Sequence, residues 1–480
     1  MKKQLQLVSI LTLTVISTSV MAKDYTPADY KSETNPDLQV IDKIEKFAKN
    51  DKKVTASVLQ KKSEAVQVNE QNLLANPSLL KRAMRSVILT KQMAGIEVVL
   101  PIYQKLADAD PLLITYAKGL LAHSKGQLDK AINYYREIIA SNPEMSVVRL
   151  DLAMALYANQ QKPTAYEQLK KLQSEPLPPA VAKMVQQMRV NIDREQEWQW
   201  NANFYFRNER NINNAPKERE VEYKGGKVTT PTPEKAQGIH LDLSVSKRFN
   251  LKGNFYSNLQ LDLNSDLFWN NHKYDDVSAQ LGVGIGYQTA QFTAQIQPFA
   301  KKRFYATDPY SVSYGASGFE SYQFTPRFKL SNNWSWEYEK FDTRKHLNGQ
   351  RQFVGISALF MRNSQQYWLA GINLYNKQAR DQDDAFIRKG AYIGLGQEWQ
   401  GGLSSKLILS LGKRDYKGVD IFNIKRSDKE YSAKLSLWHR NWHWLGITPR
   451  LVLSWNKTSS NHFLYNTQES NVNIEFSKSF

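Results

Sequence analysis

Three groups of residues in this chain have types and spacings that could support chemistry. His439 and His443 stand four residues apart, which on a helix would place two imidazoles on one face for a zinc ion. Gly282-Val-Gly-Ile-Gly286 resembles a glycine-rich phosphate loop. Ser436 and His439 could be two members of a hydrolase triad. Each of these chemistries depends on the element that holds the side chains.

The sequence around these residues predicts strands and turns, which removes the geometry that each chemistry requires. His439 and His443 would lie on either side of a turn between two strands, and no helical pattern follows Gly286. Ser436 and His439 are an odd number of positions apart, so within one strand they face opposite sides. We therefore expect no catalytic residue, no metal site and no cofactor, and we expect that the protein is not an enzyme.

From Trp198 onward, apolar residues recur with the period of two that is typical of strands. The runs 239–245, 259–263 and 451–455 alternate with polar residues, and Tyr and Trp cluster near the ends of such runs. One apolar face, one polar face and aromatic ends are typical of an outer-membrane β-barrel. We predict an α plus membrane β fold class: a helical repeat domain, then a transmembrane antiparallel barrel of about fourteen strands.

The connections between the predicted strands alternate between short and long. Short turns are predicted at 250–253, 288–290, 362–365, 400–402 and 440–442, and long links at 208–237, 302–312, 377–386, 417–429 and 456–469. Outer-membrane barrels have short periplasmic turns and long outer loops. Because the first and last links are both long, this alternation places both barrel ends, and with them the helical domain, in the periplasm.

The last residues of the chain predict the strand that closes the barrel. Val472, Ile474 and Phe476 face one side, polar residues face the other, and the pattern runs into Phe480. We expect Phe476 and Phe480 to form the signal that the barrel-assembly machinery recognises.

Residues 1–22 have the features of a secretory signal peptide. Lys2 and Lys3 precede a short apolar run, and Ala22 stands at the cleavage position. The chain contains no cysteine, which excludes a lipid-modified cysteine and disulfides. The net charge of +18 is spread along the chain, so we attribute it to a polar lumen and to loops facing lipopolysaccharide, and not to nucleic acid.

Residues 23–197 are predicted to form a periplasmic helical domain, and residues 198–480 the barrel. Two consecutive units near Gly119–Pro143 and Ala153–Leu172 resemble tetratricopeptide repeats, with an ordinary helical bundle as the alternative. Stacked repeats present a concave face that could form a client groove. The candidate groove residues are Tyr116, Leu120, His123, Leu150, Met154 and Tyr157.

The chain resembles the surface lipoprotein assembly modulator (Slam) family. Asn211-Ile-Asn-Asn-Ala-Pro216 looks like the Asn-rich signature of that family, and Gly446-Ile-Thr-Pro-Arg450 with Ser459-Ser-Asn461 is similar to its last hairpin. The family-motif positions are Asn211, Asn213, Asn214, Ala215, Pro216, Pro449, Arg450, Ser460 and Asn461. The segment Asn211–Pro216 is either an ordinary outer loop or a segment that folds into the lumen or against the barrel seam.

The resemblance implies a translocon in the outer membrane of a Gram-negative bacterium. Such a protein moves specific clients, either surface lipoproteins or a secreted haem-binding haemophore, from the periplasm to the cell surface or the medium. Its implied partners are the client, the barrel-assembly machinery, outer-membrane lipid and lipopolysaccharide, and periplasmic chaperones. A polysaccharide exporter with helical repeats and a passive porin are the alternatives.

Overall fold

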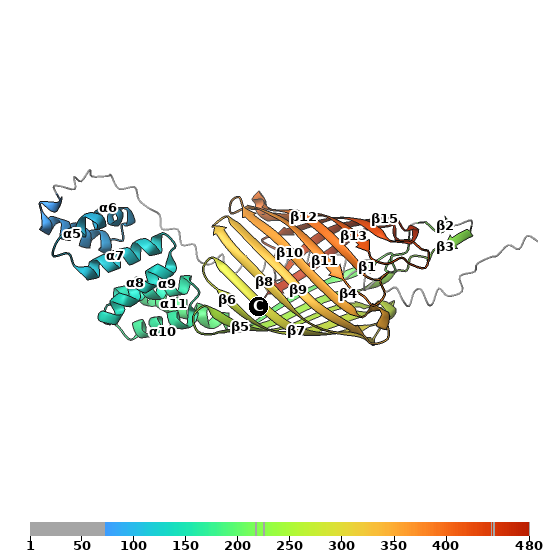
Figure 1. The fold of residues 1–480 in the computed structure, drawn as a ribbon, viewed down its shortest axis with the longest axis horizontal. Coiled ribbons are helices and arrows are strands. Elements are labelled where there is room, and N and C mark those ends of the chain that lie inside the picture. Colours follow the sequence, from blue (N-terminus) through green and yellow to red (C-terminus); the bar gives the residue numbers. More distant parts are fainter. Residues whose placement is uncertain (1–72, 217, 224–225, 443, 445–446, 480) are drawn as a thin grey trace, which may run out of the picture.

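A helical domain lies at one end of a closed β-barrel, and a small hairpin lies at the opposite end (Figure 1). The computed structural model describes residues 73–216, 218–223, 226–442, 444 and 447–479. The predicted signal peptide and Phe480 therefore lie outside the described residues. We call the end of the barrel that faces the helices proximal, and the other end distal.

Seven helices form the described part of the N-terminal domain. They are α5 (Pro77–Leu89), α6 (Met93–Tyr103), α7 (Pro111–Ser124), α8 (Leu128–Ser141), α9 (Ser146–Ala158), α10 (Lys162–Gln173) and α11 (Pro179–Glu195). Pro111 occupies the first turn of α7, where its missing N–H costs nothing, and the Asp110 side chain caps the same helix by accepting a hydrogen bond from the Leu112 N–H at 2.9 Å. Among the described residues, no helix combines the length and the apolar composition that crossing a membrane would need.

Helices α7–α8 and α9–α10 form the two predicted repeat units. Gly119 allows α7 and α8 to approach closely, because a Cβ at this position would lie 2.6 Å from the Tyr135 ring. Leu156, Leu169 and Leu172 extend the shared core through the second unit and are fully buried. A single hydrophobic core thus runs along the helical stack, as a repeat architecture requires.

The C-terminal part is a closed antiparallel barrel of fourteen strands, which confirms the predicted fold class. The barrel strands are β1 (Trp198–Glu209), β4 (Ala236–Asn250), β5 (Phe255–Phe268), β6 (Asp276–Gln288), β7 (Phe292–Tyr305), β8 (Asp308–Thr325), β9 (Phe328–Phe341), β10 (Gly349–Met361), β11 (Gln366–Lys377), β12 (Phe386–Glu398), β13 (Leu403–Tyr416), β14 (Ser427–His439), β15 (Thr448–Ser460) and β16 (Thr467–Ser479). Strands β2 (Glu220–Tyr223) and β3 (Gly226–Thr229) form a separate hairpin between β1 and β4. Short 3₁₀ turns occupy His272–Tyr274, Lys345–Leu347, Gln400–Gly402 and Phe463–Tyr465.

The predicted alternation of short and long connections fails at two places. The sequence predicts a short turn at 440–442, but β14 ends at His439 and β15 begins at Thr448, so this proximal connection is longer than the distal one at 461–466.

The sequence also predicts a long link at 302–312, but β7 and β8 are joined by Ala306 and Thr307 alone, with Tyr305 paired to Asp308. Both linking residues have positive φ, 50° and 70°, which is the backbone of a two-residue hairpin turn. The prediction of a long link here is wrong because neither residue is of the Asn or Gly type that normally marks such a turn.

The outer face of the barrel is apolar. On β6, Leu281, Val283 and Ile285 are exposed, and the glycines between them face inward. A Cβ at Gly286 would lie 2.2 Å from the Tyr256 ring, so this glycine makes room for an aromatic side chain inside the barrel. The glycine run is therefore part of a strand of the barrel wall.

Candidate functional site: lumen, closing seam and distal clasp

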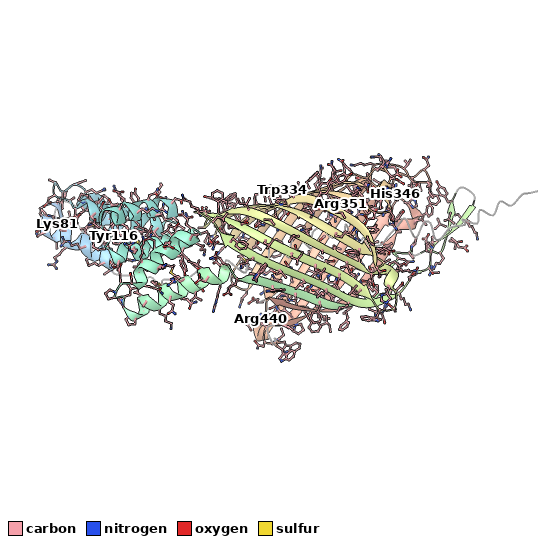
Figure 2. All side chains as sticks on the ribbon, turned by 90° about the horizontal axis from the view of Figure 1, so that it is seen from below. Lys81, Tyr116, Trp334, His346, Arg351 and Arg440 are labelled. Atoms are coloured by element: carbon pink, nitrogen blue, oxygen red, sulfur yellow. The ribbon has the colours of Figure 1, made fainter. Side chains whose placement is uncertain are left out.

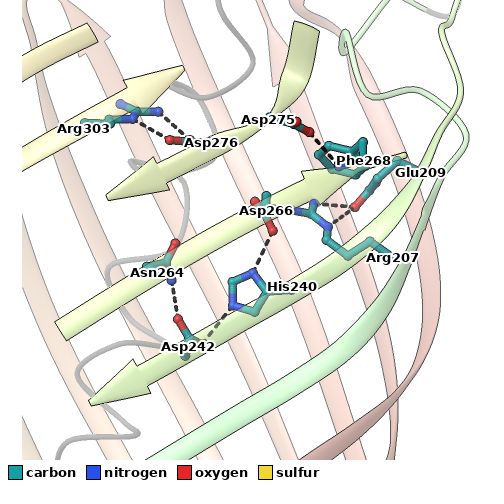
Figure 3. Close-up of polar contacts among 10 residues, drawn as sticks. All are labelled: Arg207, Glu209, His240, Asp242, Asn264, Asp266, Phe268, Asp275, Asp276 and Arg303. Carbon is teal, nitrogen blue, oxygen red and sulfur yellow. Dashed lines mark hydrogen bonds and ion pairs between the residues drawn. The ribbon is translucent and has the colours of Figure 1, made fainter. Parts of the chain in front are cut away.

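Charged side chains inside the barrel form ion pairs that join neighbouring strands. On the β1–β4–β5 wall, the Arg207 guanidinium pairs with both Glu209 and Asp266 (Figure 3). The His240 ring lies between two carboxylates, with Nδ1 2.7 Å from Asp266 and Nε2 2.9 Å from Asp242. The strands place these groups together because residues two apart on a strand share one face.

A second group of ion pairs inside the barrel joins β12, β13 and β14. The Glu430 carboxylate accepts from Arg388 Nε at 2.7 Å and pairs with Arg414 Nη2 at 2.9 Å. Gly412 leaves space for this group, because a Cβ there would lie 2.9 Å from Arg388 Nη2. These pairs fix the charged groups on the wall and give the lumen a polar lining of both signs.

The closing seam, which is the contact between β1 and β16, is the shortest strand pairing of the described barrel. Its ladder contains five residue pairs, from Asn201–Ser479 to Tyr205–Glu475. The other neighbouring strands pair over ten residues (β14–β15) to fourteen residues (β7–β8 and β8–β9). The two strands are paired in the proximal part of the seam, where the Phe204 and Phe476 rings stack with centroids 5.1 Å apart.

At the distal end, aromatic side chains from three loops meet in what we call the distal clasp: Tyr223, Phe422, His462 and Phe463. Tyr223 is at the tip of β2, and its ring lies 5.5 Å from Phe422 and 5.4 Å from Phe463, centroid to centroid. Its hydroxyl donates a hydrogen bond to the Phe422 carbonyl. The hairpin at this end is visible in Figure 1, on the side away from the helices.

His462 fixes one side of the distal clasp. Its Nδ1 accepts a hydrogen bond from the Leu464 N–H at 3.1 Å, so its Nε2 carries the proton that it donates to Asp420 at 2.5 Å. Burial lowers the pKa of His462 below its usual value, although the Asp420 carboxylate opposes this shift. The imidazole is therefore neutral at pH 7, and it joins the loop before β14 to the loop before β16.

The helical domain contacts the proximal rim of the barrel through a short turn. The Asn254 side chain, which is buried between β4 and β5, donates hydrogen bonds to the Asn159 carbonyl at 2.5 Å and to the Gln288 carbonyl at 2.7 Å. Asn159 ends α9, so the second repeat unit rests on the turns next to β1. Helix α11 ends at Glu195, and β1 begins three residues later at Trp198.

The structure divides the predicted groove residues into two groups. Tyr116 and Leu120 are buried in the helical core, so they do not line an open surface. Figure 2 labels Tyr116 within the helical domain. The Tyr116 hydroxyl donates to Asp151 at 2.6 Å, and Asp151 also pairs with Lys91 at 2.5 Å. Sequence position alone assigns a face of a helix, and here the neighbouring helices cover that face.

The other predicted groove residues are partly exposed: His123, Leu150, Met154 and Tyr157. Burial lowers the pKa of His123, whose ring meets Tyr135 edge-on at 6.4 Å. The Tyr157 ring is covered by the Lys162 ammonium at 3.7 Å, and Lys162 pairs with Glu195 at 3.1 Å. This surface therefore combines aromatic, thioether and charged groups.

The Asn-rich segment lies at the distal rim, against β4 and β5. The Asn211 side chain donates to the Ala215 carbonyl at 2.9 Å and accepts from the Ala215 N–H at 2.8 Å. The Asn213 amide bonds across to Thr232 at 2.7 Å, and Ile212 packs against Phe268. Asn214 has a positive φ of 50°, a conformation that Asn tolerates well.

The rest of this segment and the last hairpin are placed in a similar way. Pro216 is buried next to Ala215. The Asn461 side chain accepts from the Ser427 N–H at 2.7 Å and donates to the Lys425 carbonyl at 2.9 Å. Ser460 accepts from the His462 N–H at 3.0 Å, which connects this motif to the distal clasp.

Pro449 and Arg450 lie at the proximal end of β15, opposite the last residues of β16. Pro449 pairs with Phe476 and Arg450 with Glu475 in the ladder. The Arg450 guanidinium lies over the Trp438 ring at 5.0 Å. Phe476 thus contacts both neighbours of the last strand, β15 by pairing and β1 by stacking.

The residues considered for zinc or hydrolase chemistry are not assembled into such a site. His439 ends β14, and its Nε2 lies 2.8 Å from the Gly401 carbonyl, in the turn before β13. His443 lies outside the described residues. Within the part of the chain that the structure describes, no three His, Asp or Glu side chains form a group that could hold a metal ion.

The sequence reasoning did not find the β2–β3 hairpin, the distal clasp or the short ladder of the closing seam. A signal for the hairpin was present, because Glu220–Tyr223 and Gly226–Thr229 flank a Lys-Gly pair with alternating apolar residues. No sequence signal marks the clasp, since its four residues come from three separate loops.

Two protein-family models match the chain. The model described as "Surface lipoprotein assembly modifier" matches residues 198–480. The model described as "Surface lipoprotein assembly modifier, N-terminal TPR repeats" matches residues 66–169, which covers the first predicted repeat unit and most of the second.

Several curated proteins are similar to this chain over most of their length. Surface lipoprotein assembly modifier 1 of Neisseria meningitidis serogroup B is 35% identical, over 90% of this chain and 88% of that protein. Surface lipoprotein assembly modifier 1 of Haemophilus influenzae strain Rd is 31% identical, over 97% and 98%. The hemophilin secretion modulator of Acinetobacter baumannii is 21% identical, over 86% and 89%.

Proposed function

The chain belongs to the surface lipoprotein assembly modifier family, and we propose that it is an outer-membrane translocon for specific client proteins. In this proposal, a client passes from the periplasm through the barrel to the cell surface or the medium. The client is either a surface lipoprotein or a secreted haem-binding protein.

The observation that carries the proposal is the seating of a helical repeat stack on the proximal rim of the barrel, through Asn254 and Asn159. Repeat stacks are binding surfaces for other polypeptides. A porin that conducts small solutes has no need of such a surface at its entrance. Most of the long connections of the barrel lie at the end away from the helices, which supports a periplasmic helical domain.

The names of the relatives indicate the two kinds of client. Relatives from Neisseria and Haemophilus are named for surface lipoproteins, and the Acinetobacter relative for the secretion of hemophilin. We assign the first contact with the client to the partly exposed residues of the helical surface, His123, Leu150, Met154 and Tyr157. We further assign assembly of the barrel to the barrel-assembly machinery through its last strand.

The Asn-rich segment receives a supporting role in this proposal. Its side-chain amides satisfy loop carbonyls and hold Ile212 on Phe268, so it shapes the distal rim beside β1. A client that leaves the barrel would pass this rim. The segment therefore acts on client release, while the ladders that close the barrel do not depend on it.

The test is to co-express the protein with candidate clients encoded next to its gene, in a host that lacks relatives of this family. We expect antibody binding and protease shaving of intact cells to detect the correct client only when the protein is present. A periplasmic lipoprotein unrelated to the candidates serves as the control and stays protected from protease.

Two further readouts separate the alternatives. Surface glycan, measured by lectin binding, would rise for a polysaccharide exporter, and uptake of small antibiotics would rise for a porin. If every candidate client stays inside the cell while one of these readouts rises, the translocon proposal fails.

A further inference from the structure

The distal half of the closing seam has two strand edges that do not pair with each other. The described β1–β16 ladder ends at Tyr205–Glu475. Continuing the register would place Phe206 opposite Ile474 and Asn208 opposite Val472, yet the ladder contains neither pair. On their other sides, β1 pairs with β4 over twelve residues and β16 pairs with β15 over eleven.

The outward side chains along this part of the seam are exposed, as are outward residues of the paired strands such as Ile372 and Leu411. Phe206 is 61% exposed, Ile474 52% and Val472 66%, and all three face outward from the barrel. A thiol introduced at one of these positions is therefore open to a partner outside the barrel wall.

The distal clasp joins the two connections on either side of this seam, at the distal end of the barrel. Tyr223 belongs to the connection that leaves β1, and Phe463 belongs to the connection that enters β16. Phe422 lies between them in the loop before β14 and contacts both rings. The hairpin is thus attached to one edge of the seam and held to the loop of the other edge.

Backbone groups on an open strand edge need a hydrogen-bonding partner, and hydrocarbon cannot supply one. An extended polypeptide segment can, because adding a strand to an edge satisfies its N–H and C=O groups. Alternating side chains on such a strand would face lipid on one side and the polar lumen on the other. The seam therefore fits an amphipathic β-strand.

We propose that the distal half of the β1–β16 seam is a lateral portal that takes up an extended segment of the client as a transient strand. Tyr223 and the distal clasp hold the loops at the distal end of the portal together until the client engages. The inference rests on the proposed function, since the client is the polypeptide that reaches this seam. In this proposal the client leaves the barrel sideways, through the distal half of its wall.

The chain contains no native cysteine, so in the first test an introduced cysteine is its only thiol. We would trap the client on a single cysteine, Ile474→Cys or Phe206→Cys, using a client with one cysteine in a segment of alternating pattern. Ile372→Cys is the matched control, because Ile372 is 61% exposed on the same outward face and its strand β11 pairs with both neighbours. We expect adducts at Ile474 and Phe206 that exceed those at Ile372 at least tenfold.

The second test closes the portal. In the double variant Phe206→Cys with Ile474→Cys, oxidation would join the two edges in the register of the proximal ladder. We expect client display to be lost on oxidation and restored by reductant. The control Leu243→Cys with Leu263→Cys, an existing pair of β4 and β5, keeps full display.

The third test addresses the clasp. Tyr223→Ala removes the ring that joins the two loops, and we expect faster adduct formation at Phe206 with unchanged barrel abundance. Tyr223→Phe, which keeps the ring, should stay close to the unsubstituted rate. Equal rates in all three proteins would overturn the role of the clasp.

The portal itself is overturned by either of two results: adducts at Ile474 and Phe206 no stronger than at Ile372, or full display from the joined seam. Both results count only when the unsubstituted chain displays its client in the same experiment. A failure of display by the unsubstituted chain instead refutes the proposed function, so the two outcomes remain distinguishable.

Discussion

The helical domain and the barrel of this chain use opposite arrangements of apolar and charged residues. In the helical domain, Leu80 and Leu156 are fully buried. In the barrel, Arg414 and Asp428 are buried, while Ile372 and Leu411 are exposed. The difference shows that the surroundings decide which residues turn outward: water surrounds the helices, and hydrocarbon surrounds the barrel wall.

Each region also contains a few residues that follow the arrangement of the other region. Asp151 is buried among the helices, where Lys91 and Tyr116 satisfy its carboxylate. Leu369 and Ile408 form an apolar contact inside the barrel. Both exceptions are satisfied locally, so they leave the general arrangement of each region intact.

The largest effect is expected from a charge in the helical core. Leu156→Arg would bury a charge without a partner, so we expect a loss of about 4–5 kcal/mol and an unfolded helical domain. The helical circular dichroism at 222 nm would fall while the barrel keeps its heat-modifiable mobility on gels. Val147→Arg, at an exposed position of the same helix, should change stability by less than about 0.5 kcal/mol. Equal effects of the two variants would contradict the buried position of Leu156.

A smaller effect is expected from a charge on the outer face of the barrel. Ile372 is 61% exposed in the middle of β11, so Ile372→Arg should lower the free energy of unfolding by about 2–4 kcal/mol in lipid vesicles. The measurement is the urea midpoint followed by tryptophan fluorescence.

The matched control is Ile421→Arg, at an even more exposed isoleucine in the loop before β14. Because this loop lies outside the barrel wall, we expect no measurable change. If Ile421→Arg were as harmful as Ile372→Arg, exposure alone would set the cost and the hydrocarbon explanation would be wrong.

The smallest effect concerns a carboxylate in the distal loop between β11 and β12. Burial raises the pKa of Asp384 to about 6, with Asp383 adding to the rise and Lys377 opposing it. The folded loop then binds a proton more tightly than the unfolded chain does. This contribution to stability is present below about pH 4 and is lost as the pH rises through 6.

Asp384→Asn should remove this pH dependence. We would follow protease cleavage of the loop between pH 4 and 7, where the unsubstituted chain should become more sensitive as the pH rises. Asp342→Asn, in the neighbouring distal loop, serves as the control and should keep the slope. A slope that survives in Asp384→Asn would assign it to another group.

Much of the architecture could be predicted from the sequence because it rests on local periodicity. The spacing of small and apolar residues from Gly119 through Tyr135 predicts the helix pair α7–α8. The alternation of Val472 and Ile474 with polar residues predicts a strand with one lipid face. Each of these signals lies within a few residues of chain, where backbone geometry fixes which side chains share a face.

The failures have the opposite origin. The two-residue turn at Ala306–Thr307 is imposed by the paired strands on either side, so its own residue types give no warning. Tyr116 was expected on an open surface, but a neighbouring helix covers it and supplies Asp151 as its partner. In both cases a contact with another element overrules the local signal.

The sequence by itself determined that helices precede strands, that one strand face is apolar, and that the barrel contains about fourteen strands, because periodicity and turns are properties of consecutive residues. Only the tertiary structure decided which edges meet and how far. The five-pair seam between β1 and β16 and the contacts of Tyr223 with Phe422 and Phe463 join segments that are hundreds of residues apart. Their geometry follows from the closure of the whole barrel, and no local pattern records it.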